Sequence, residues 1–70
     1  MVDEALEARV RVVCDIAEME QWDEEKTEKE LRRVHREYHL EILEILGRTY
    51  KLKSDNLEQC RREIREKYPD

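Results

Sequence analysis

The chain has 70 residues, 47% of them charged, and a formal net charge of −5. A chain of this length forms at most one domain, residues 1–70, whose core is too small for an enclosed catalytic cleft. No face gathers enough unopposed Lys and Arg to displace the counterions of a nucleic acid, so the sequence also argues against nucleic-acid binding.

One Gly and one Pro, together with periodic apolar residues and interspersed charges of both signs, favour helix over disorder. No apolar run reaches the length of a membrane span, and the N-terminal residues lack the basic and apolar segments of a signal peptide. The two cysteines are too few for a disulfide framework. We therefore expect a soluble all-α protein of a reducing, cytoplasmic-type environment, and predict nothing further about its localisation.

The first predicted helix spans residues 3–21. Asp3 and Glu4 place an acceptor and negative charge at its N-terminus, where free backbone N–H groups favour them. Its apolar residues form two stripes about 100° apart on the helix surface. The stripes are Leu6, Val10, Val13 and Ala17, and Ala5, Val12, Ile16 and Met19. Because a helix with two apolar stripes usually contacts two neighbours, we expect this helix to touch both of the others.

Residues 20–30 carry no Gly or Pro, so the end of the first helix is open to two interpretations. Asp23 followed by two Glu residues resembles a helix start, and Thr27 with Glu30 is a competing capping box. Either lets the chain reverse direction. The alternative is one long helix over residues 3–46, because apolar heptad positions continue across the gap, although three successive layers there are polar.

The second predicted helix spans residues 24–46 and is the element around which the chain is organised. Its apolar residues recur at three- and four-residue steps, which places them on one face that the other two helices must cover. This central stripe consists of Leu31, Val34, Tyr38, Ile42, Ile45 and Leu46. Gly47 follows it directly and is predicted to end the helix in a left-handed conformation.

The third predicted helix spans residues 55–68, after a connector of residues 48–53. Ser54 or Asp55 is expected to cap it, with Glu58 completing a capping box, and Pro69 ends it. Its stripe consists of Leu57, Cys60, Ile64 and Tyr68. The last 24 residues carry seven basic and five acidic residues, so they complement the acidic remainder of the chain.

Leu40 and Leu43 lie well away from the centre of the central stripe and so need a cover of their own. One expectation is that the connector folds back, so that Tyr50 and Leu52 pack over them. The other is that they form an exposed patch through which two copies of the chain self-associate. No other partner is predicted.

Two histidines and two cysteines are the residues best suited to metal binding or covalent chemistry. His35 and His39 have the i, i+4 spacing of a helical zinc pair, but the Glu that follows the first His of the zincin motif is replaced by Arg36. We therefore assign both histidines to the border between core and solvent. Cys14 and Cys60 are expected to be free thiols, because the helix positions put them at different heights. No catalytic, cofactor-binding or metal-binding residue is predicted, and the chain is not expected to be an enzyme.

The sparse Gly and Pro, Gly47 after a helix and regular salt-bridge spacings resemble a computationally designed helical bundle. The spacings are Glu7 with Arg11, Glu28 with Arg32 and Glu58 with Arg62. The resemblance is one of style and matches no natural family; it implies a structural protein without biochemical activity. The prediction is a monomeric three-helix up-down-up bundle. The alternative is a homodimeric coiled-coil interaction module, with residues 3–46 as its long helix.

Overall fold

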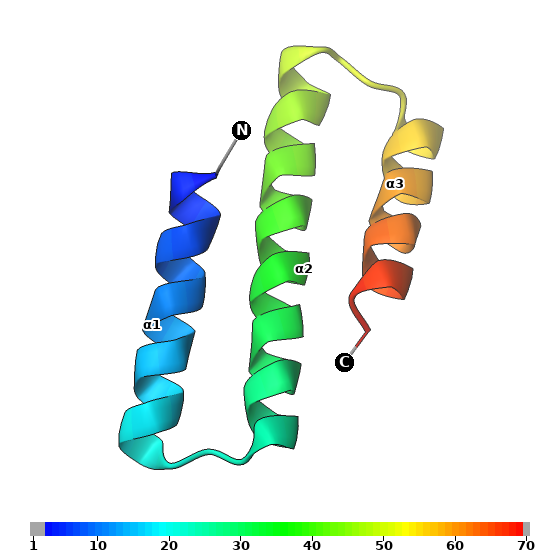
Figure 1. Ribbon diagram of the computed structural model, residues 1–70. Coiled ribbons are helices and arrows are strands. Elements are labelled where there is room, and N and C mark those ends of the chain that lie inside the picture. The colour runs from blue at the N-terminus through cyan, green and yellow to red at the C-terminus, as the bar shows by residue number, and fades with distance from the viewer. Residues whose placement is uncertain (1–2, 70) are drawn as a thin grey trace.

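The structure is a computed structural model that describes residues 3–69. It contains three helices, α1 (Glu4–Glu20), α2 (Glu24–Thr49) and α3 (Ser54–Lys67), and no strand within the described residues. Successive helices run in opposite directions, so the all-α, up-down-up, three-helix bundle is confirmed (Figure 1). No helix among residues 3–69 combines the length and apolar character that crossing a membrane requires.

The chain reverses between α1 and α2 without a glycine. Gln21 takes up left-handed dihedral angles, with φ 57° and ψ 45°, and the amide of Trp22 donates to the carbonyl of Ala17 at 2.9 Å. This is the hydrogen bond of a Schellman C-cap, here formed by a residue with a side chain. Asp23 then caps α2, because its carboxylate accepts the amide of Lys26 at 2.8 Å. The alternative of one long helix over residues 3–46 is therefore wrong.

Gly47 does not end α2, contrary to the prediction. The helix continues to Thr49, and the left-handed residue that closes it is Lys51, with φ 53°. Gly47 lies inside the last turns and is buried against α3, where an added Cβ would meet Leu57 Cδ2 at 2.6 Å. The absence of a side chain at Gly47 thus serves the close approach of α3. An apolar stripe followed by Gly is the expected sequence pattern both for a glycine that ends a helix and for one that allows a close helix contact.

The connector and the start of α3 also differ from the prediction. Because α2 is longer than expected, only residues 50–53 join it to α3. The N-cap position is Lys53, whose side chain makes no capping hydrogen bond, in place of the expected Ser54 or Asp55. The amide of Leu57 donates to the carbonyl of Lys53 at 3.0 Å, which is the ordinary first hydrogen bond of a helix, so the amides of the first turn have no side-chain cap.

The bundle is open, with α2 in the middle and one helix on each side of it (Figure 1). Both α1 and α3 pack against α2, and no Cα atom of α1 comes within 8 Å of one in α3. Tyr38 faces α1 and Gly47 faces α3. They are nine residues apart, which places them about 180° apart around the axis of α2. The expectation that α1 touches both other helices is therefore wrong, because α1 and α3 occupy opposite sides of α2.

The open arrangement leaves a thin core. The only apolar side chains of the described residues that are buried belong to Ala17 and Tyr38, and Tyr38 is 7% exposed. Of the central stripe, Leu31, Val34 and Ile42 are half-buried, whereas Ile45 and Leu46 are exposed. Ile45 lies seven residues beyond Tyr38 on the same face of α2, but α1 begins beside Tyr38 and does not extend that far along α2.

Leu40 and Leu43 are half-buried on the α3 side of α2. Leu40 lies beside Arg65 and Pro69 at the C-terminal end of α3. The connector does not fold over the two leucines, because Tyr50 remains 71% exposed, so that expectation is wrong. Self-association through Leu40 and Leu43 would require α3 to move aside, since α3 already flanks this side of α2.

Candidate functional site

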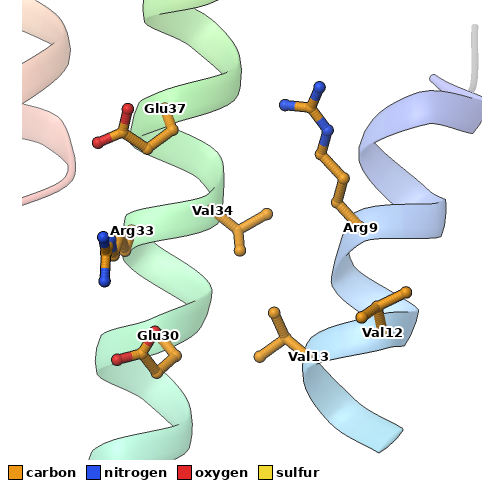
Figure 2. A pocket seen from close by; sticks show the side chains of 7 residues that line it. All are labelled: Arg9, Val12, Val13, Glu30, Arg33, Val34 and Glu37. Atoms are coloured by element: carbon orange, nitrogen blue, oxygen red, sulfur yellow. The ribbon is translucent and has the colours of Figure 1, made fainter. Parts of the chain in front are cut away.

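A groove of about 370 Å³ runs between α1 and α2 on the side of the molecule opposite the view of Figure 1. Figure 2 shows its two walls: Val13 of α1 and Val34 of α2 point toward each other, and Val12 lies on α1 at the edge of the groove. The rim is charged and consists of Arg9, Glu30, Arg33 and Glu37. An apolar floor with a charged rim suits an apolar side chain that arrives on a charged helix, and it holds no nucleophile.

The exposed face of α1 continues this groove along the helix. We call outer stripe the row Ala5, Ala8, Val12, Ile16 and Met19. All five are exposed: Val12 by 55%, Ile16 by 39% and Met19 by 80%. The other stripe of α1 packs against α2 and contains the buried Ala17. A row of apolar side chains along one helix that no other helix covers marks a contact surface.

A polar clamp holds the start of α1 against the middle of α2. The Asp3 carboxylate accepts the amide of Ala5 at 3.2 Å and so caps α1, and it also accepts the hydroxyl of Tyr38. The guanidinium of Arg9 lies 5.5 Å from the centre of the Tyr38 ring and donates to Glu41 at 2.9 Å. The buried tyrosine thereby keeps its hydroxyl satisfied while its ring fills the interface.

The two histidines face the C-terminal end of α3. The rings of His35 and His39 stack with that of Tyr68, with centroid distances of 5.5 and 5.3 Å and interplanar angles of 11° and 8°. The Tyr68 hydroxyl also lies 3.4 Å from His39 Nε2. Within residues 3–69, no three His, Cys, Asp or Glu side chains gather closely enough to hold a metal ion. The i, i+4 spacing of the two histidines places both imidazole rings against the ring of Tyr68.

An ion-pair cluster joins the C-terminal half of α2 to the middle of α3. Arg61 donates to Glu44 Oε1 through both Nε, at 2.8 Å, and Nη2, at 2.6 Å, and it also pairs with Glu58. Hydrogen bonding to Glu44 first, and to Glu58 second, raises the pKa of the Arg61 guanidinium above its ordinary value. Sequence spacing pairs Glu58 with Arg62, whereas in the structure Glu58 turns to Arg61. The group is exposed, so it orients α3 more than it stabilises it.

Cys14 and Cys60 are free thiols, as expected. Cys14 is exposed on α1 and Cys60 is half-buried on α3, helices that lie on opposite sides of α2. A bond between them would require their Cα atoms to come within about 7 Å, which this arrangement prevents.

Sequence reasoning missed three parts of this site. The pairing of Asp3 with Tyr38 joins residues 35 apart, and the pairing of Tyr68 with His39 joins residues 29 apart, so no local pattern announces either. The exposed state of the outer stripe depends on where α3 lies, which the stripes themselves do not encode. A signal for the outer stripe was nevertheless present, because α1 has more apolar surface than one neighbour can cover. No family model, curated protein or solved structure matches the chain.

Proposed function

We propose that the protein is a structural helical module without catalytic activity, which acts through the packing of its helices and through surface contact. The supporting observation is that the polar side chains best suited to catalysis form contacts that hold helices in place. Asp3 caps a helix and binds Tyr38, His39 stacks on Tyr68, and Arg61 joins two helices through carboxylates. Each of these groups is engaged in holding one helix against another.

The groove between α1 and α2 supports the same proposal. Catalysis by a side chain requires a nucleophile or an acid–base pair positioned over a bound substrate. The groove is lined by Val12, Val13 and Val34 (Figure 2), and Arg9 of its rim is already engaged with Tyr38 and Glu41. The stylistic resemblance to designed bundles agrees with a chain whose sequence serves folding and contact.

Thermal unfolding with and without zinc tests this proposal at its most reactive residues, His35 and His39. Because their rings are engaged with Tyr68, we expect neither zinc nor EDTA to move the melting temperature. The control is a variant with both His35→Gln and His39→Gln. A rise of several degrees with zinc that this double variant abolishes would contradict the proposal and assign the pair to metal binding.

The second candidate function is that of a protein-interaction module, and the outer stripe is the observation that favours it. Apolar side chains on an otherwise highly charged surface mark sites of contact with other proteins. In this chain they form a row along α1 and adjoin the apolar groove, so that one approaching helix would meet both.

A further inference from the structure

We propose that the outer stripe of α1 is a homodimer interface, and that a second copy of this chain docks there with its own α1 antiparallel. This inference does not depend on whether the chain lacks catalytic activity. It also differs from the coiled-coil alternative above, because it uses the exposed stripe of α1 and leaves the fold unchanged.

The order of small and large residues in the outer stripe makes it complementary to itself. Ala5 and Met19 lie seven residues on either side of Val12, and Ala8 and Ile16 lie four residues on either side. A two-fold axis through Val12 therefore sets Met19 of each copy against Ala5 of the other. It likewise sets Ile16 against Ala8. Large residues then face small ones in every layer except the central one, where Val12 meets Val12 of the second copy.

The charges along the groove follow the same two-fold axis. Figure 2 shows Val12 lying, along the helix direction, between Arg33 and Glu30 of α2. Rotation about an axis at Val12 reverses this order in the second copy. Arg33 of each copy is then opposite Glu30 of the other, which gives two equivalent ion pairs beside the apolar contact. Antiparallel helices present the same flank to each other, so both α2 helices lie on one side of the α1 pair.

The dimer is expected to be weak and to strengthen with salt. Five side chains on one helix bury less than the roughly 1,200 Å² of a standard stable interface. Each copy carries a net charge of −5, and residues 1–22 contain six acidic and two basic residues, so the two α1 helices repel at long range. Added salt screens that repulsion more than it weakens the apolar contact.

Sedimentation equilibrium of the full chain, from micromolar to millimolar concentration, tests the interface. We expect a reversible monomer–dimer equilibrium, and we expect Val12→Lys to weaken dimerisation at least tenfold, because it places two ammonium groups at the two-fold axis. Glu7→Gln is the matched control: it changes the net charge equally on the opposite face of α1 and leaves the dimer intact. Val12 is 55% exposed, so the lysine does not disturb the monomer, as circular dichroism can verify. A chain that stays monomeric at millimolar concentration overturns the proposal.

Cross-linking tests the direction of the two helices. In a background of Cys14→Ser and Cys60→Ser, the variants Ala5→Cys and Met19→Cys are oxidised separately and as a mixture. The antiparallel register predicts disulfide-linked dimers mainly in the mixture, and a Val12→Cys variant that cross-links by itself. Glu7→Cys is the control and should remain monomeric. Efficient cross-linking of Ala5→Cys alone would overturn the antiparallel arrangement.

A charge swap tests the register between the α2 helices. Arg33→Glu and Glu30→Arg should each weaken the dimer several-fold, because each leaves two like-charged pairs across the axis. The double variant restores both ion pairs within the dimer and should recover the original affinity at unchanged net charge. Failure of the double variant to recover affinity would overturn the assigned register.

Discussion

The two interfaces of α2 differ in what holds them. Toward α1, the contact is apolar and includes the two buried side chains, Ala17 and Tyr38, with one buried hydroxyl bonded to Asp3. Toward α3, it consists of an exposed ion-pair cluster at Arg61, a stack of rings around Tyr68 and the insertion of Leu57 beside Gly47. No side chain of α3 is buried.

The two interfaces show that helices of one bundle can differ in the free energy that holds each of them in place. Burial of apolar area supplies about 25 cal/mol per Å², whereas exposed ion pairs contribute about 0–1 kcal/mol each. The α1–α2 hairpin should therefore be the more stable half of the molecule. Helix α3 should open more often, and its amides should exchange with solvent faster than those of α2.

The largest expected effect comes from removing the ring at the centre of the α1–α2 interface. Tyr38→Ala should destabilise the chain by about 3–5 kcal/mol, because it creates a cavity and leaves Asp3 without its hydroxyl partner. Denaturant unfolding followed by circular dichroism measures this change. Tyr50→Ala removes the same ring from a 71% exposed position and should have almost no effect. Similar losses from the two variants would contradict the assignment of the core.

The next prediction concerns the close contact between α2 and α3. In a Leu57→Ala background, Gly47→Ala should stabilise the chain by about 1 kcal/mol, because alanine is the better helix former. In the native chain this gain should be lost, because the new Cβ meets Leu57 Cδ2 at 2.6 Å. A double-mutant cycle measures the coupling between the two positions. Equal gains in both backgrounds would show that α3 does not approach Gly47 so closely.

Capping α3 should reduce the difference between the two halves. Lys53→Asp supplies the missing side-chain acceptor at the N-cap and should stabilise the chain by about 1 kcal/mol. Lys53→Glu makes the same charge change with a poor capping residue and is the matched control. Hydrogen exchange should show slower opening of α3 with little change in α1. An equal effect of the two variants would assign the gain to charge alone.

The smallest expected effect concerns the turn that closes α1. Gln21 occupies left-handed angles that glycine adopts without strain, so Gln21→Gly should stabilise the α1–α2 hairpin by about 0.5–1 kcal/mol. Gln21→Ala keeps the strain and serves as the control. Thermal unfolding compares the three chains. A loss of stability with glycine would contradict the Schellman geometry of this turn.

Local sequence patterns are enough to predict the three helices. They are not enough to predict which helix packs against which face. Asp23 is one of the two helix starts that the sequence offers, because capping needs only the residues that follow it, and α2 begins where Asp23 predicts. The prediction that Gly47 ends α2 is wrong because a helix end and a close helix contact both select glycine. Periodicity identifies apolar faces but cannot say which neighbour covers them, so the exposure of Val12 could be learned only from the structure.

The lack of contact between α1 and α3 makes the molecule nearly one-dimensional, like a short repeat protein. Each helix meets only its neighbour in sequence, so the native state contains two hairpins that share α2. Contacts between sequence neighbours require only short loop closures, and chains dominated by such contacts fold within microseconds to milliseconds. Folding can therefore begin in either hairpin and spread along α2 to the other.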